Sequence, residues 1–240
     1  DRRGLKTLFT FDAAGHITRM AIFTDGNPVG EPLSYVTSYK YNAAGERTRI
    51  RYPKGNATEF SYDALGNLLQ IRRKKVGIPK GVDDSTDIVT TFTYEPTFNL
   101  VKRVTDPNGN VTTYVYDYEL GEPTRGNLRK INFPAVGGVT PRTAFAYNSF
   151  GQVVKVTDPN GHITRYIYDS VTGYLIQTKA AAGTPEAATT SFTYDSVGNV
   201  TSTTDPNGHA TTFEHNLLNQ LTQATAPAPF NFAMHYSYDA

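Results

Sequence analysis

The sequence contains no cysteine and no tryptophan, and its charges nearly cancel, with 23 basic residues against 22 acidic ones among 240. Without cysteine, the chain can form no disulfide, thiolate nucleophile or zinc–sulfur site. A net charge of +1 argues against a nucleic-acid partner, because nucleic-acid-binding proteins neutralise phosphates with an excess of lysine and arginine. No apolar run approaches the roughly 20 residues that a membrane-spanning helix needs. These absences exclude a disulfide scaffold. They also predict that the chain has no nucleic-acid partner and no membrane-spanning segment.

Motifs for catalysis and metal binding are also missing. The chain has no His-Glu-x-x-His, no Gly-x-Ser-x-Gly, no phosphate or dinucleotide loop and no EF-hand loop. Two of its five histidines, His162 and His209, follow equivalent turns, and we interpret them as solvated turn residues; metal binding is the alternative. We therefore predict no catalytic residue, no metal ligand and no cofactor, and a chain that is not an enzyme.

One basic run stands at the end of an expected strand, at residues 72–75, with Lys80 nearby. We interpret it as the solvated base of a loop, because Asp83, Asp84 and Asp87 offset its charge. A patch for an anionic partner is the alternative.

The dominant feature of the sequence is a repeat: an aromatic residue, then Asp or Asn, two further residues and Gly. We call the first residue of each copy the anchor. The full copies contain Phe11, Asp12 and Gly15; Tyr41, Asn42 and Gly45; Tyr62, Asp63 and Gly66; Tyr147, Asn148 and Gly151; and Tyr194, Asp195 and Gly198. Looser copies contain Tyr94 (with Phe98 at the glycine position), Tyr116 and Asp117, Tyr168 and Asp169 (with Gly173 after one inserted residue), His215 (with Asn219), and Tyr238 and Asp239.

Upstream of every anchor the sequence alternates with period two, which is the signature of a β-strand. A second aromatic residue lies two positions before each anchor, and Thr lies four positions before nine of the ten. Thr and aromatic side chains favour a pleated surface. We expect the aromatic rings to share one sheet face and to stack on their equivalents in neighbouring hairpins, as in the pairs Phe60 and Tyr62, Tyr114 and Tyr116, and Tyr166 and Tyr168.

Two kinds of turn separate the strands. In Asp-x-x-Gly, the Asp at the first position of a type I turn accepts a backbone N–H, and the Gly at the fourth adopts positive φ. The second turn reads Asp106, Pro107, Asn108 and Gly109; Asp158, Pro159, Asn160 and Gly161; and Asp205, Pro206, Asn207 and Gly208. Each repeat is thus a hairpin of about 21 residues, and we assign the extra length of longer repeats to this second turn, at residues 24–36, 74–89, 134–141 and 180–188. The sequence therefore predicts an all-β chain of antiparallel hairpins in one long curled sheet, because open twisted sheets rarely exceed about 10 strands without curling or splitting.

Residues 9–240 resemble the RHS/YD-repeat family, in motifs such as 62–68 and 194–200 and in the Asp-Pro-Asn-Gly-x-x-Thr-x-Tyr-x-Tyr-Asp strings at 106–117 and 158–169. The resemblance implies a sheet that spirals into a hollow shell. In bacterial members such a shell encloses a C-terminal toxin, and in teneurins it supports cell adhesion. A β-propeller and a glycan-binding β-solenoid are rival architectures, but the blade signatures of the first and the tryptophans of the second are missing.

The resemblance leads us to expect a single RHS/YD-repeat domain over residues 1–240, a fragment of a longer protein with about ten repeats. Its expected role is non-catalytic: part of a shell that encapsulates a toxin or cargo domain of a secreted or cell-surface bacterial protein. The expected partners are other RHS repeats and a C-terminal toxin or cargo domain of the same polypeptide. The alternative is a module that binds a cell-surface glycan or protein receptor through the rim of long loops.

Overall fold

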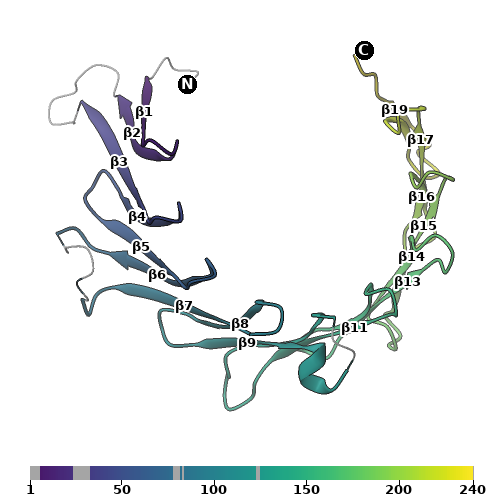
Figure 1. Cartoon of the computed structure of the whole chain (residues 1–240). Coiled ribbons are helices and arrows are strands. Elements are labelled where there is room, and N and C mark those ends of the chain that lie inside the picture. Colours follow the sequence, from purple (N-terminus) through teal and green to yellow (C-terminus); the bar gives the residue numbers. More distant parts are fainter. Residues whose placement is uncertain (1–5, 24–32, 78–81, 83, 123–124, 240) are drawn as a thin grey trace. The chain divides into compact units, whose positions relative to one another are not determined.

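The structure is a computed structural model that describes residues 6–23, 33–77, 82, 84–122 and 125–239. In this part of the chain the regular elements are nineteen β-strands and one short 3-10 helix, η1 (Asp117–Leu120) (Figure 1). The predicted all-β fold class is confirmed. No helix in the described ranges has the length and hydrophobicity to cross a membrane.

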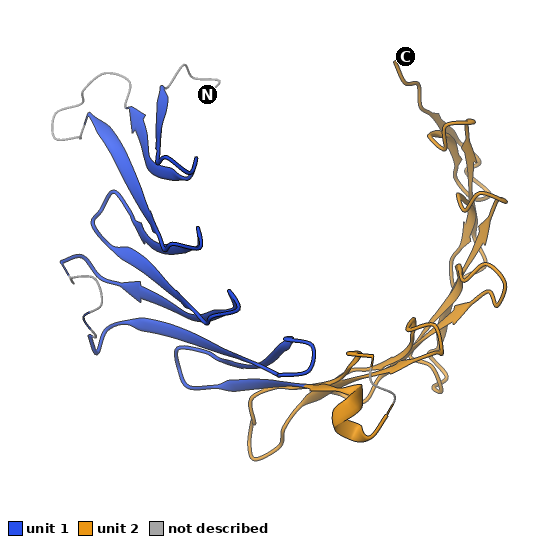
Figure 2. Ribbon diagram, viewed as in Figure 1, with its two compact units in different colours: residues 1–114 blue, residues 115–240 orange. Residues whose placement is uncertain are grey.

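The chain divides into two compact units, residues 1–114 (unit 1) and residues 115–240 (unit 2) (Figure 2). The first nine strands are β1 (Thr7–Phe11), β2 (Ile17–Phe23), β3 (Ser34–Tyr41), β4 (Arg47–Arg51), β5 (Ala57–Tyr62), β6 (Leu68–Lys74), β7 (Ile88–Tyr94), β8 (Val101–Thr105) and β9 (Val111–Tyr116), whose last two residues belong to unit 2. Unit 2 continues with β10 (Leu128–Asn132), β11 (Arg142–Tyr147), β12 (Val153–Thr157), β13 (Ile163–Tyr168), β14 (Leu175–Ala180), β15 (Ala188–Tyr194), β16 (Val200–Thr204), β17 (Ala210–His215), β18 (Leu221–Thr225) and β19 (Ala233–His235). The single repeat domain over residues 1–240 stays a prediction.

Within each unit, every strand pairs antiparallel with the next strand along the chain, as a succession of hairpins requires. The expected strands after the first turns are present, for example β6, which begins at Leu68, and β12, which begins at Val153. In unit 2 the sheet bends along its strand order (Figure 1). The fold is therefore a meander in which each hairpin is hydrogen-bonded to its neighbours in sequence.

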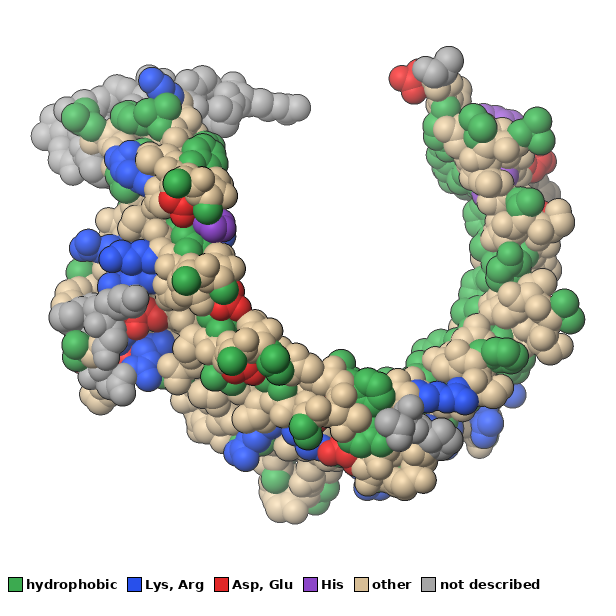
Figure 3. Space-filling view, viewed as in Figure 1, with side chains coloured by type: hydrophobic (Ala, Val, Ile, Leu, Met, Phe, Trp, Pro, Cys, Tyr) green, Lys and Arg blue, Asp and Glu red, His purple; other side chains and the backbone are tan. Residues whose placement is uncertain are grey.

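The strand register separates the side chains into two faces, which we call the aromatic face and the polar face. In unit 2 the aromatic face carries Phe145 opposite Val156, Tyr166 opposite Thr178, Phe192 opposite Thr203 and Phe213 opposite Ala224. The alternate positions form the polar face, which is rich in Thr, Ser, Gln, Lys and Arg. Figure 3 shows hydrophobic side chains along the inner side of the bend of unit 2, so its aromatic face is the inner face.

Each unit is a single layer of sheet, so burial is shallow. Among the described residues the buried hydrophobic residues are few and mostly small: Ala21, Ala57, Tyr116, Ala182 and Ala224. Most rings of the aromatic face stay half-buried, because neighbouring hairpins cover their edges and no second layer covers their faces. The stability of such a sheet must come from contacts between adjacent hairpins.

A β-bulge interrupts the ladder directly before the anchor in each regular hairpin. In β5 and β6, Tyr62 pairs with Leu68 while Ser61 pairs with Gln70, which leaves Leu69 as the extra residue. The same shift precedes the anchors Phe11, Tyr41, Tyr94, Tyr147, Tyr168, Tyr194 and His215. Bulges increase local strand twist, so a repeated bulge adds twist at every hairpin.

The described residues include part of the long second turns. Residues 24–32, 78–81 and 83 lie outside the described residues. In the segment 134–141, Val136 and Val139 form an isolated β-bridge around Gly137 and Gly138, whose φ values are +57° and +80°. Positive φ at both central positions is the requirement of a type I′ turn. This long turn is therefore a small extension of the hairpin.

The second-turn glycines allow a test of turn geometry at one open position. Gly161 has φ +87°, and a Cβ placed on it meets no atom within 4 Å. We expect Gly161→Ala to lower the free energy of unfolding by about 1–2 kcal/mol, the cost of a left-handed backbone for an L-residue. Gly161→Asn should cost less than half as much, because Asn tolerates this conformation. Urea melts of both variants measure the difference, and equal losses would contradict the backbone explanation.

Candidate functional site

The repeated first turn is built around the carboxylate or amide oxygen of the residue that follows the anchor. Asp63 Oδ1 accepts hydrogen bonds from the backbone N–H groups of Leu65 and Asn67, both at 2.9 Å. The turn closes through Gly66 N–H and Asp63 C=O at 3.2 Å. Asn148 has the same role: its amide oxygen accepts hydrogen bonds from the backbone N–H groups of Phe150 and Gln152.

The residue after the turn glycine completes this arrangement, a role that the repeat motif did not predict. Asn67 Nδ2 donates to Asp63 Oδ2 at 2.9 Å, and Asn110 Nδ2 donates to Asp106 Oδ2 at 2.8 Å. The signal was present in the sequence, because an amide, imidazole or carboxylate side chain follows the glycine of most turns. Both turn types therefore share one hydrogen-bonding scheme.

The histidines His162 and His209 occupy this same position in the second turns. Their Nδ1 atoms lie 3.0 and 3.1 Å from Asp158 Oδ2 and Asp205 Oδ2. The histidine side chains remain 66% and 54% exposed, which agrees with their interpretation as turn residues.

These hydrogen bonds shift the acidity of the turn carboxyl groups. The side-chain N–H of Asn67, followed by backbone N–H groups, holds the pKa of Asp63 below its usual value. The same holds for Asp106, where the amide of Asn110 is the largest cause. Hydrogen bonds that favour the charged form of a carboxyl group lower its pKa, so these carboxylates are kept ionised as acceptors for their own turns.

The anchor tyrosines fasten each hairpin to the one before it. Their hydroxyl groups donate to the backbone carbonyl of the first residue after the preceding bulged turn, at 2.8–3.0 Å. The pairs are Tyr41 to Ile17, Tyr62 to Arg47, Tyr94 to Leu68, Tyr147 to Leu128, Tyr168 to Val153, Tyr194 to Leu175 and Tyr238 to Leu221. We call this contact the tyrosine latch.

The expected ladder of stacked rings is wrong for five of the six rings named above, and the sixth, Tyr116, stacks on Tyr118 of its own repeat at 6.2 Å. Phe60, Tyr62, Tyr114, Tyr166 and Tyr168 make no ring–ring contact with a described residue. Rings on equivalent positions are two strands apart, roughly 9–10 Å at the usual strand spacing, which exceeds the 4.5–7 Å of a ring pair. The ring contacts that do form use other partners. His16 stacks on Tyr41 at 4.7 Å and Tyr174 meets Tyr194 at 5.0 Å.

The looser copy at Tyr94 departs from its predicted register. The motif spacing predicts Phe98 at the glycine position, but Asn99 adopts the positive φ of +58°. Glu95 replaces Asp, and its longer side chain spans one extra residue, accepting from the N–H groups of Thr97, Phe98 and Leu100 at 2.7–2.9 Å. In the copy at His215, Asn219 does take the glycine position, with φ +61°.

The copy at Tyr116 is the most irregular, and here the extra length lies in the first turn as well as at 134–141. Asp117 is 1% exposed. Its carboxylate accepts from the N–H groups of Tyr118 at 2.8 Å, Arg125 and Gly126 at 3.2 Å and Asn127 at 3.1 Å. Burial raises the pKa of this carboxyl group, but the backbone N–H groups, led by that of Asn127, outweigh burial and hold it below its ordinary value.

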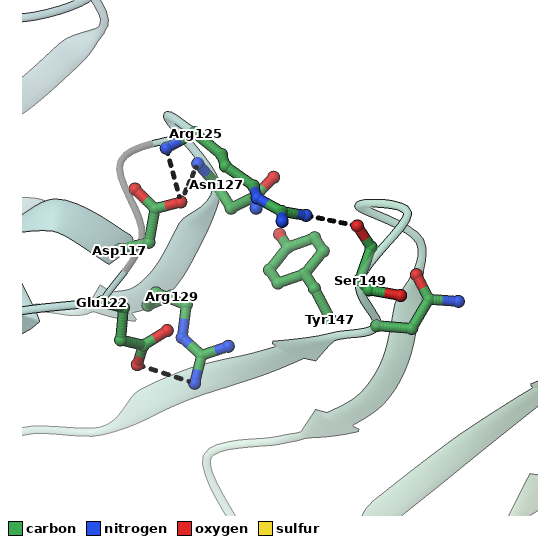
Figure 4. A pocket seen from close by; sticks show the side chains of 8 residues that line it. Asp117, Glu122, Arg125, Asn127, Arg129, Tyr147 and Ser149 are labelled. Carbon is green, nitrogen blue, oxygen red and sulfur yellow. Dashed lines mark hydrogen bonds and ion pairs between the residues drawn. The ribbon is translucent and has the colours of Figure 1, made fainter.

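Beside this turn lies a cavity of about 220 Å³ in unit 2 (Figure 4). Glu122 pairs with Arg129 at 3.1 Å. Arg125 donates to the carbonyl of Ser149 in the next turn, and the Tyr147 hydroxyl donates to the Leu128 carbonyl at 2.8 Å. Burial raises the pKa of Tyr147. The polar groups of this cavity are thus mostly engaged in tying the irregular turn to the following hairpin.

The basic run of residues 72–75 is partly buried. Lys74 Nζ lies 2.9 Å from Asp87 Oδ2 and also donates to the Val82 carbonyl, and Arg72 lies 3.4 Å from the same carboxylate. Lys80 and Asp83, which the sequence analysis included in this region, lie outside the described residues. Asp87 thus offsets part of the run, as predicted, but the interpretation of the run as solvated is wrong for Lys74, which is buried.

Chemistry beyond these contacts is sparse. Within the described ranges, no three His, Asp or Glu side chains come together in a way that could hold a metal ion. The carboxyl groups of Asp63, Asp106 and Asp117 are engaged by hydrogen bonds within their own turns, and their pKa values lie below the ordinary value.

A chain of antiparallel hairpins that fasten to one another through turn carboxylates and tyrosine latches is a β-hairpin repeat protein. The Teneurin YD-shell family model matches residues 1–184, and the RHS Repeat family model matches residues 189–228. The chain therefore belongs to the teneurin YD-shell family, and the resemblance inferred from the Tyr-Asp repeats is confirmed.

Known proteins agree with this assignment. The chain is 27% identical over 168 residues to the double-stranded DNA deaminase toxin A of Burkholderia cenocepacia (strain H111), covering 70% of this chain and 10% of the relative. It superposes on a TcdB2-TccC3-Cdc42 crystal structure with a TM-score of 0.67 at 19% identity, covering 98% of this chain and 14% of that one. A Photorhabdus luminescens Tc holotoxin pore structure gives a TM-score of 0.64 at 20% identity, covering 92% and 12%.

These matches identify the fold of the chain and give the share of each related protein that it covers. The chain has the fold seen in the TcdB2-TccC3-Cdc42 structure, and its membership of the teneurin YD-shell family supports a structural shell role. It spans 10% of the curated relative and 14% of the first solved chain.

The tyrosine latch can be tested within one strand. Tyr168 of β13 donates to Val153, whereas the hydroxyl of Tyr166 has no hydrogen-bond partner among the described residues. We expect Tyr168→Phe to lower the free energy of unfolding by about 0.5–1.5 kcal/mol, the usual worth of one hydrogen bond. Tyr166→Phe should change it by less than about 0.5 kcal/mol, as for a hydroxyl that bonds nothing. Urea melts followed by circular dichroism measure both, and equal effects would show that the latch does not stabilise the array.

The buried carboxylate of Asp117 predicts a pH dependence. Because its folded pKa lies below the ordinary value of 3.8, its contribution to stability is present above that value and is lost as pH falls through the folded pKa. We expect Asp117→Asn to cost about 1.5–3 kcal/mol at neutral pH, since it weakens hydrogen bonds to a charged acceptor. The difference in free energy of unfolding between Asp117→Asn and the unmodified chain should become smaller at pH 3 and below.

Glu214→Gln, an exposed change in the same unit, is the matched control and should cost little at either pH. Urea melts at pH 7 and pH 3 measure all three proteins. A cost for Asp117→Asn that does not change with pH would contradict the role of the charge.

Proposed function

We propose that this chain is a non-catalytic stretch of wall in an RHS/YD shell that encloses a toxin or cargo segment of a secreted or surface bacterial protein. The tyrosine latch is the observation that supports it. A wall needs continuity from hairpin to hairpin, and seven anchor hydroxyls bond to the preceding hairpin in the described residues. The turn carboxylates serve the same continuity by fixing the geometry of each hairpin.

The aromatic face is the side that we assign to the cargo. It is a single-layer surface whose rings remain partly open, and at the ends of the described chain Phe9 and Tyr238 are each 49% exposed. Contiguous apolar surface of this kind usually marks a contact with another polypeptide segment. In unit 2 this face is on the inner side of the bend (Figure 3). The proposed partners are therefore further repeats along the same polypeptide and the segment that they enclose.

Limited proteolysis of the full-length polypeptide that carries these repeats tests the proposal. A segment enclosed by the wall should be cut at least about tenfold more slowly than the same segment produced alone, because cleavage then depends on opening of the wall. The double variant Tyr168→Phe and Tyr194→Phe should increase the rate at which the protease cleaves the enclosed segment. Tyr166→Phe should leave this rate unchanged. Equal cleavage of the segment with and without the repeats would refute enclosure.

A further inference from the structure

The charges of this near-neutral chain are segregated along the sequence. Residues 1–114 contain 16 basic and 12 acidic residues, and residues 115–240 contain 7 and 10. All seven basic residues of unit 2 lie between Arg125 and Lys179, and residues 180–240 contain neither lysine nor arginine. The cations of unit 2 are therefore confined to its first hairpins, although the unit as a whole is acidic.

Five of these cations share the polar face of β10–β14, and we call them the basic face. Lys155 of β12 pairs directly with Arg165 of β13, which pairs directly with Lys179 of β14. Lys130 and Arg142 lie on the same face of β10 and β11, in register with Ala144 and Asn132. The five strands contain no Asp or Glu.

Nothing in the described chain neutralises the basic face. None of its five side chains forms an ion pair or hydrogen bond with a described residue. Like charges directly opposite one another on adjacent strands destabilise a sheet. A row of three unpaired cations therefore costs the fold stability, which an anionic ligand would offset.

A cavity of about 500 Å³ opens at one edge of the basic face, where β10 and β11 meet the second turn of β12 and β13. Lys130 and Arg142 line it together with Thr157, Pro159 and Asn160. Asp158 also lines it, but its carboxylate is engaged by the N–H groups of its own turn and by His162. The cavity thus combines free cations with hydroxyl and amide groups and a small apolar wall, and none of its lining residues is aromatic.

We propose that the basic face binds an acidic polysaccharide, whose sugars carry carboxylate or sulfate groups, with one sugar unit seated in this cavity. The cations can pair with the acidic groups of the polysaccharide. Thr157 and Asn160 can form hydrogen bonds with sugar hydroxyls, and Pro159 can pack against the C–H face of a sugar ring. Successive strands lie about 4.8 Å apart, so Lys155, Arg165 and Lys179 form a track along which an extended chain can continue.

Other polyanions fit this surface less well. A single-stranded nucleic acid needs aromatic rings for base stacking, and none lines the cavity. A DNA duplex is read by an element that enters a groove, whereas this face is the outer side of a bent sheet (Figure 3). The binding of a polysaccharide is independent of the shell role, since that role uses the opposite face.

Binding of a fluorescent heparin dodecasaccharide to the 240-residue chain tests the proposal, with a DNA duplex of equal charge and poly-glutamate as comparison probes. We expect binding that weakens steeply with salt, as expected for cation–anion contacts. Replacing Lys155, Arg165 and Lys179 together by Gln should weaken it at least about tenfold, and Arg142→Gln should weaken it about threefold or more.

The matched control replaces Arg19, Lys40 and Arg51 by Gln. These cations are also exposed and on a polar face, but in unit 1. Of the three, Lys40 lines a cavity of about 380 Å³, whose lining contains no second lysine or arginine. The control should bind within about twofold of the unmodified chain. Thermal melts should show the unit 2 triple variant to be at least as stable as the unmodified chain, because it relieves like-charge repulsion.

Three outcomes would overturn the proposal: no heparin binding at low salt, equal losses in the triple variant and its control, or DNA or poly-glutamate binding as tightly as heparin. The second would show general charge attraction, and the third would assign the surface to another class of polyanion.

Discussion

A single layer of sheet cannot bury a hydrophobic core between two surfaces, so its hairpins must be held together edge to edge. In this chain the tyrosine latch supplies the link beyond the strand ladder itself. An anchor such as Tyr194 sits at the end of one strand, and its hydroxyl bonds to the Leu175 carbonyl of the hairpin before it. The half-buried rings place that hydroxyl, and the bulge before the anchor orients the ring. The turn, the bulge and the latch therefore act together to hold adjacent hairpins to one another, and this combination is repeated along each unit.

The division of the sheet into an aromatic face and a polar face gives one thin wall two different surfaces. The aromatic face carries the latches and the apolar surface that we assign to an enclosed segment. The polar face carries the unpaired cations of β10–β14, including the directly opposed Lys155, Arg165 and Lys179. Since a one-residue change of register exchanges the two faces of a strand, the turns that fix register also keep these two surfaces apart.

Much of the fold could be predicted from the sequence because its signals are local. The Asp-x-x-Gly and Asp-Pro-Asn-Gly turns set their own geometry within five residues, as Asp63 and Asp158 show. The period-two pattern then places the strands and both faces. The predicted turn register was wrong where a copy departs from the motif: Asn99, and not Phe98, has the positive φ.

Features that depend on the distance between hairpins could not be predicted in the same way. The latch joins residues 15–26 positions apart through a bulge that has no sequence signature of its own. The ladder of stacked rings was expected from residue type, but equivalent rings lie two strands apart. The buried Asp117 was assigned to an ordinary turn because its four N–H donors lie up to ten residues away, in a segment with no fixed spacing.

The latches all point the same way, towards the part of the chain that precedes them. Tyr41 bonds to Ile17, and Tyr238 bonds to Leu221; in each of the seven latches among the described residues the acceptor comes earlier in the chain than the tyrosine. Ribosomes release a polypeptide from its N-terminus onwards, so each new hairpin finds its acceptor already made. Hairpins can therefore be added in chain order during translation, and an open acceptor carbonyl waits only until the anchor 15–26 residues later has been synthesised.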